Sequence, residues 1–176
     1  PNTPAGAVPA TQFTIGSLIG PIPSLNTKFA LVIGNGASLI ADQQLPFAAD
    51  DAQKVREALV LHAGYAEGNV DLVLNATAEQ LQTAAKALAD RVPEGGVVLL
   101  YFTGVGVDIN GKDYLVGCDA DALTAQGAMV AKGDLYQLFM NRGAKVFAFF
   151  QAHRPILDGR YFGMEVPMVG SISQSQ

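Results

Sequence analysis

Few residues in this chain could act as a nucleophile, a base or a metal ligand. The chain has one cysteine, Cys118, and two histidines, His62 and His153. A thiolate nucleophile needs a base within hydrogen-bonding distance, so Cys118 with His153 is the pair from which a cysteine-based site could be built. Asp119 and Asp121 lie two residues apart and could bind a metal or share a proton. A role in a loop or a helix cap is the simpler interpretation of these two carboxylates.

His153 by itself could bind a metal or relay a proton, but either role needs partners. The other histidine, His62, lies on or beside the apolar stripe of a predicted helix, near the end of that helix. There we expect a packed or half-exposed structural histidine. We therefore expect no metal site and no cofactor, and an inert His153.

A short apolar stretch followed by glycines indicates where a site would lie. Residues 97–102 (VVLLYF) are too few for a membrane span and predict a strand buried on both faces of a parallel sheet. Residues 103–106 (TGVG) then predict a turn at the carboxyl edge of the sheet, where α/β proteins usually place their sites. The side chain delivered there is Val105, which can neither donate a proton nor bind a metal.

The segments around this stretch alternate between strand and helix patterns. Buried strands are predicted at 29–33, 70–74, 97–102 and 145–150, and helices from about 50 to Gly64, from the Thr77–Gln80 capping box to Pro93, and over 134–142. Asn110-Gly111 favours a hairpin turn, and 123–131 has no regular pattern. This order predicts an α/β fold with a mainly parallel sheet and helices on both faces. Val105 and His153 would then be neighbours at one edge of the sheet.

Composition limits the class of protein. The chain of 176 residues suits one domain, is 49% hydrophobic and only 15% charged, and carries a net charge of −5. No cluster of Lys and Arg is available to bind phosphates, so we expect no nucleic-acid partner. No stretch reaches the length of a membrane span. A surface with so few charges is typical of a protein that makes contacts with other molecules.

Residues 1–27 form a predicted extended arm, followed by a domain over 28–176. The prolines of this arm exclude a regular helix, and residues 11–15 alternate like a short strand. The arm is nevertheless apolar, with Phe13, Ile15, Leu18, Ile19 and Ile22. Such an arm either packs on its own domain or adds to the sheet edge of a neighbouring subunit.

Between Lys28 and Pro155 the chain resembles the caspase-like cysteine peptidases, in particular the prokaryotic caspase and metacaspase-type domains. The segments that carry the resemblance follow one another in the family's order: Ala30–Asn35, Asp50–Ala52, Leu61–Tyr65, Tyr101–Gly106, Asp113–Ala120 and Gln151–Arg154. The resemblance implies a three-layer α/β sandwich. It also implies a general base at the end of one strand, a nucleophilic cysteine at the end of the next, and an acidic residue two positions before that cysteine.

All three of those positions differ in this chain. The base is replaced by Val105, the acidic residue by Gln151 and the nucleophile by His153. Cys118 falls in a segment that the family does not use for chemistry. The resemblance therefore implies an inactive, degenerate peptidase.

Family members also continue beyond the nucleophile strand with about two further strands, whereas 156–176 offers one candidate, 166–172. We expect a sheet that is short at its carboxyl end, with an open edge that recruits another strand. The leading hypothesis is a structural or self-assembly module, a homo-oligomer or filament subunit joined by its arm. The alternatives are a pseudo-peptidase that binds a peptide or protein partner, and a cysteine peptidase with non-standard catalytic residues.

The compartment is indicated only by composition and by the first residue. The chain starts with Pro1 instead of Met and is rich in Ala, Gly, Ser and Gln. We expect an extracellular or cell-surface location, with the cytoplasm as the alternative. A single cysteine excludes an internal disulfide and leaves the redox compartment open.

Overall fold

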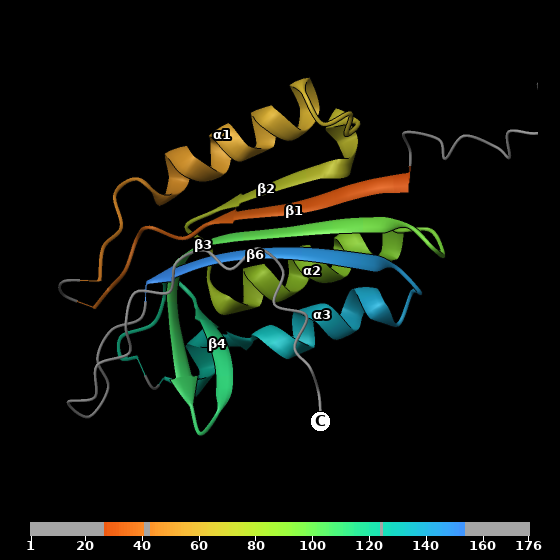
Figure 1. Cartoon of the computed structure of the whole chain (residues 1–176). Coiled ribbons are helices and arrows are strands. Elements are labelled where there is room, and N and C mark those ends of the chain that lie inside the picture. Colours follow the sequence, from red (N-terminus) through yellow and green to blue (C-terminus); the bar gives the residue numbers. More distant parts are fainter. Residues whose placement is uncertain (1–26, 41–42, 124, 154–176) are drawn as a thin grey trace, which may run out of the picture.

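The computed structural model of this chain describes residues 27–40, 43–123 and 125–153. A central sheet is covered by helix α1 (Ala48–Leu61) on one face and by α2 (Ala78–Arg91) and α3 (Lys132–Met140) on the other (Figure 1). This confirms the predicted α/β architecture with helices on both faces. The predicted arm and the strand candidate at 166–172 lie outside the described residues.

The main part of the sheet is parallel. β1 (Lys28–Gly34) pairs in parallel with β2 (Val70–Leu74) and with β3 (Val97–Ile109), and β6 (Lys145–His153) pairs in parallel with the other side of β3. These strands therefore follow the order β2-β1-β3-β6. Their carboxyl ends meet at one edge, as the alternation of strands and helices predicted.

Beyond the parallel part, β3 continues into an antiparallel extension. It forms a hairpin with β4 (Lys112–Val116), which pairs antiparallel with β5 (Met129–Ala131). The predicted Asn110-Gly111 turn is confirmed: both residues have positive φ, 55° and 79°, and the Asp108 carboxylate accepts a hydrogen bond from the Gly111 N–H at 3.0 Å. The prediction of an irregular 123–131 is wrong at β5, because a buried strand of three residues is too short to show a period.

The predicted turn at residues 103–106 is also wrong, because β3 runs through it as one strand of 13 residues. Gly104 and Gly106 are not among the described glycines with positive φ. Their role is close packing: a Cβ at Gly106 would lie 2.9 Å from the Ala152 Cβ, and one at Gly104 would lie 3.0 Å from the Asn35 carbonyl oxygen. Glycine permits such close approach of neighbouring chain segments.

The helix predictions are confirmed with small shifts at the ends. Thr77 and Gln80 form the predicted capping box of α2: the Thr77 hydroxyl accepts from the Gln80 N–H at 3.2 Å, and the Gln80 side-chain oxygen accepts from the Thr77 N–H at 2.9 Å. α3 begins and ends two residues earlier than the predicted 134–142, a difference that is usual for helix ends. No helix among the described residues is long and apolar enough to cross a membrane.

β6 differs in part from the predicted buried strand at 145–150. Val146, Ala148, Phe150 and Ala152 pack against the core beneath α2 and α3, but Phe147 is 56% exposed on the opposite face. The core on that opposite side consists of α1 packed over β1 and β2 and the adjoining residues of β3. Because α1 does not extend over β6, the apolar run of β6 is buried on one side only.

Candidate functional site

The site expected from the sequence lies where β3 and β6 run side by side toward the carboxyl edge. Val105 pairs with His153 and Thr103 pairs with Gln151 in the β3–β6 register. The prediction that Val105 and His153 are neighbours is therefore confirmed. Paired residues of parallel strands lie on the same face of a sheet, so Val105, Gln151 and His153 form one group.

Val105 is not presented to solvent at this edge. Its side chain is 5% exposed and belongs to an apolar cluster with the hairpin and the segments that follow it. The other buried members of this cluster are Val107, Val116, Ala120, Ala128 and Met129. Gln151 and His153 are exposed. The group therefore places a buried aliphatic side chain beside an exposed amide and an exposed imidazole.

The edge is held together by a buried amide that the sequence analysis did not single out. Asn35 follows β1 and is 3% exposed. Its side-chain NH2 donates to the carbonyl oxygens of Ala76 (2.9 Å) and Val116 (3.2 Å), and its side-chain oxygen accepts from the Ala76 N–H (2.7 Å). Its backbone N–H donates to the Thr103 carbonyl oxygen at 2.8 Å. One residue thus joins β1 to β3, to β4 and to the segment after β2.

Cys118 lies beside the end of β2, away from His153. Its thiol donates a hydrogen bond to the Asn75 carbonyl oxygen at 3.0 Å, and its backbone N–H donates to the Ala76 carbonyl oxygen at 2.9 Å. Two strands, β1 and β3, separate β2 from β6. With about 4.8 Å between neighbouring strands, the end of β2 and His153 are on the order of 14 Å apart. The structure does not bring this thiol and this imidazole together.

The surroundings of Cys118 also disfavour its thiolate. Burial raises the pKa of the Cys118 thiol, and the nearby Asp119 carboxylate raises it further. Nucleophilic cysteines need the opposite shift, which a cationic neighbour or a helix N-terminus supplies. Cys118 therefore carries its proton at neutral pH.

Of the remaining candidates, Asp119 has a structural role. The Asp119 carboxylate accepts a hydrogen bond from the Ala78 N–H at 3.2 Å, at the start of α2, which confirms the capping interpretation. Asp121 is exposed. His62 is exposed after the end of α1, not packed or half-exposed as expected. Across the described residues, no group of three or more His, Cys, Asp or Glu side chains is placed to hold a metal.

A depression of about 280 Å³ lies at the opposite, amino end of the sheet, bordered by Val92, Glu94, Asn141, Arg142 and Gly143. The Arg142 guanidinium beside it donates to the carbonyl oxygens of Ala89 (2.9 Å) and Asp90 (3.0 Å). Lys and Arg side chains commonly satisfy the last carbonyls of a helix in this way. Arg142 therefore closes the end of α2 with its donors.

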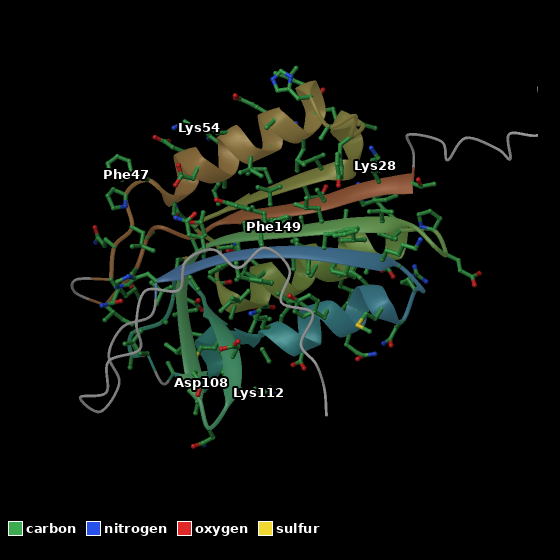
Figure 2. The ribbon with its side chains drawn as sticks, viewed as in Figure 1. Lys28, Phe47, Lys54, Asp108, Lys112 and Phe149 are labelled. Atoms are coloured by element: carbon green, nitrogen blue, oxygen red, sulfur yellow. The ribbon has the colours of Figure 1, made fainter. Side chains whose placement is uncertain are left out.

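On the face of the sheet that α1 covers, apolar side chains continue past that helix onto β6. Phe147 pairs with Leu99, and Phe149 pairs with Tyr101. Figure 2 shows Phe149 on the sheet, next to the face that α1 covers. Burial raises the pKa of Tyr101, and the Asp51 carboxylate in the first turn of α1 raises it further. Tyr101 therefore lies between the part of this face that α1 covers and the part on β6 that α1 leaves uncovered.

Comparisons with known proteins agree with this geometry. Among solved structures, a crystal structure of a protein from Geobacter sulfurreducens is similar, with a TM-score of 0.53 and 19% identity over 71% of this chain; this chain spans half of that protein. At this identity the likeness concerns the fold alone. No curated protein sequence matches. The family model described as the caspase domain of peptidase family C14 matches residues 27–164. This chain belongs to the caspase domain family.

Proposed function

We propose that this caspase domain is not a peptidase and that it acts as a structural, self-assembling module, an oligomer or filament subunit joined to its neighbours by its N-terminal arm. The observation that supports the first part is the pairing of Val105 with His153 at the carboxyl edge. Peptide hydrolysis by this family's chemistry needs a thiolate and a base in contact. Val105 is a buried aliphatic side chain, and His153 is a base without a nucleophile.

Cys118 does not repair this loss. Its thiol bonds to the carbonyl of Asn75 at the other side of the sheet, and its pKa is raised. Gln151, in the position where many relatives hold an acid that binds a basic substrate side chain, has no charge to offer. This chain therefore lacks both the side chains that carry out the family's reaction and the acidic side chain that contacts the substrate.

Self-assembly is supported by the surface of the domain and by the arm. Charged residues make up only 15% of the chain, and residues 1–27 contain no Asp, Glu, Lys, Arg or His. Large apolar side chains are exposed on several elements, including Met140 at 59% and Phe147 at 56%. An uncharged, apolar arm and an apolar surface are complementary, because contact between them buries apolar area on both.

The test separates catalysis from assembly. Purified full chain is incubated with peptides that carry a basic or an acidic residue before the scissile bond, and with a thiol-reactive peptidyl probe. We expect no hydrolysis. Proteolysis that Cys118→Ala abolishes would contradict the first part of the proposal. In parallel, light scattering and electron microscopy compare the full chain with a chain lacking residues 1–23. We expect assemblies from the full chain and monomers after the deletion; assembly unchanged by the deletion would contradict the second part.

A second candidate function is capture of a peptide or protein at the carboxyl edge. It is favoured by Leu39 and Phe47, which are 70% and 72% exposed in the segment between β1 and α1. Here a monomer should bind a partner, and the exposed positions Gln151 and His153 tolerate a large residue without loss of the core. Binding that survives Gln151→Trp with His153→Trp excludes this edge as the binding site.

A further inference from the structure

The outer edge of β6 is available for pairing in the described part of the chain. There β6 pairs with β3 alone, over its whole length of nine residues. A strand with one unpaired edge presents a row of N–H and C=O groups that another strand can continue. The edge of β6 can therefore accept an added strand of similar length.

The sheet face beside this edge is apolar. Phe147 and Phe149 point to the side of α1, because their neighbours Ala148 and Phe150 pack against the core under α2 and α3. The Phe150 ring lies 5.9 Å from the ring of Tyr136 in α3. Phe147 is 56% exposed. Adjacent aromatic residues on an uncovered sheet face are typical of a contact surface.

Residues 10–20 have the properties that this edge requires. They contain no proline, although Pro9 and Pro21 flank them, and no charged residue. Every backbone N–H of the segment can therefore join a ladder, and its burial requires no desolvation of a charge. Phe13 and Ile15 are two residues apart, so in an added strand they would lie on one face. Phe147 and Phe149 have the same spacing, so the two pairs can lie side by side.

The other segment outside the described residues fits this surface less well. Residues 154–176 carry four charged side chains, at Arg154, Asp158, Arg160 and Glu165. Their strand candidate, 166–172, begins with Val-Pro, and a proline interrupts the donors of an added strand. The charge-free segment 10–20 is therefore the better occupant.

The spacer between this segment and β1 favours a neighbouring copy over the chain's own sheet. Lys28 pairs with Val97, and Val97 pairs with Lys145, so β3 separates the start of β1 from β6. A proline disfavours the helical conformation in the residue before it, so Pro21 and Pro23 favour an extended spacer. The sequence thus predicts a semi-rigid spacer of about 3 Å per residue, which opposes the bend needed to cross its own β3 and β6.

We propose that the edge of β6 accepts residues 10–20 of a second copy of this chain as an added strand, with Phe13 and Ile15 beside Phe147 and Phe149. This inference rests on the proposed function, since it assigns the surface that the arm contacts. Donor and acceptor are different surfaces of one chain, so the contact is head-to-tail. Repetition of such a contact gives a ring when the rotation closes and a filament when it does not.

The test is photo-crosslinking between copies that differ in isotope. A full chain with p-benzoylphenylalanine in place of Phe147 is mixed with an excess of ¹⁵N-labelled chain without it, irradiated and analysed by mass spectrometry. We expect crosslinks from position 147 to ¹⁵N-labelled residues 10–20. Crosslinks to residues 10–20 of the same, unlabelled chain, or to residues 154–176, overturn the inference. The same crosslinker at Phe47, which is 72% exposed, is the control and should not reach residues 10–20.

A substitution distinguishes failure of this inference from failure of the proposed function. Phe147→Glu adds a charge at an exposed position, so the domain should still fold, and we expect its association to weaken by about tenfold or more. Leu61→Glu, at a still more exposed position on α1 (71% against 56% for Phe147), should associate like the parent. Assembly that depends on the arm but is unchanged by Phe147→Glu overturns the β6 assignment and leaves the proposed function in place. A full chain that is monomeric overturns the proposed function itself.

Discussion

Asn35 should be one of the most sensitive positions in this domain. Replacement by Ala removes the partners of three buried backbone groups: the N–H and the carbonyl of Ala76, and the carbonyl of Val116. Each unsatisfied buried group costs about 1 kcal/mol or more. The expected loss in the free energy of unfolding for Asn35→Ala is therefore about 3 kcal/mol. For a domain of this size that corresponds to a decrease in Tm of roughly 6–12 °C.

The measurement is urea unfolding followed by circular dichroism, with Asn69→Ala as the matched control. The Asn69 side chain makes one hydrogen bond in a partly buried site, to the Lys28 carbonyl oxygen at 3.2 Å. Its loss should cost about 1 kcal/mol or less. A loss in the free energy of unfolding for Asn35→Ala that is no larger than the loss for Asn69→Ala would refute the conclusion that Asn35 joins the segments at the carboxyl edge of the sheet.

Asn35→Asp gives a second readout, since it tests the donors of the amide separately. The new carboxylate would face two carbonyl oxygens in a buried site, which raises its pKa above the usual value of about 3.9. A group whose pKa is raised on folding contributes stability below its unfolded pKa, and that stability is lost as pH rises through the folded value. The Asp variant should therefore lose more stability relative to the parent at pH 7 than at pH 4. An equal loss at both pH values would show that the carboxyl is not buried against these carbonyls.

Three further predictions concern single contacts. Thr77→Ala removes the capping box of α2 and should lower the free energy of unfolding by about 1 kcal/mol, whereas Thr83→Ala, at an exposed position inside the same helix, should not; equal effects would argue against the cap. Gly106→Ala places a Cβ 2.9 Å from the neighbouring strand β6 and should lower that free energy by about 1–3 kcal/mol, whereas Gly68→Ala meets nothing within 4 Å and should have little effect. The reaction of Cys118 with a thiol reagent should have its pH midpoint above that of the same thiol in urea, because its pKa is raised; a midpoint at or below the unfolded value would contradict this direction of the shift.

Much of the fold followed from local patterns in the sequence. The strands at 29–33 and 70–74 and the helix that begins at Thr77 are confirmed nearly to the residue, because their apolar period and their cap lie within a few positions of each other. The hairpin at Asn110-Gly111 is likewise a local property, since both residues adopt positive φ without large strain. The prediction that Val105 and His153 are neighbours at one edge of the sheet followed from the order of strands and helices alone.

Other features depend on contacts between segments far apart in the chain. Glycine at 104 and 106 is compatible with a turn or with a tightly packed strand. The strand is distinguished from the turn only by the close approach of Ala152 to Gly106 and of the Asn35 carbonyl oxygen to Gly104. β5 exists because β4 lies beside it. Asn35 was not identified, although a polar residue directly after a buried strand was a signal; its three partners come from segments that are distant in sequence.

The sequence by itself determined which side chains stand near the ends of the two strands, namely Val105, Gln151 and His153, because residue identity needs no coordinates. It also determined the alternation of elements, because hydrophobic period and caps are local. Only the tertiary structure decided that Val105 is buried, that Cys118 lies beside β2 and away from His153, and that one face and one edge of β6 remain uncovered in the described part of the chain. The physical reason is that burial and proximity depend on which segments pack against each other. The pattern within one segment carries no information about its partner.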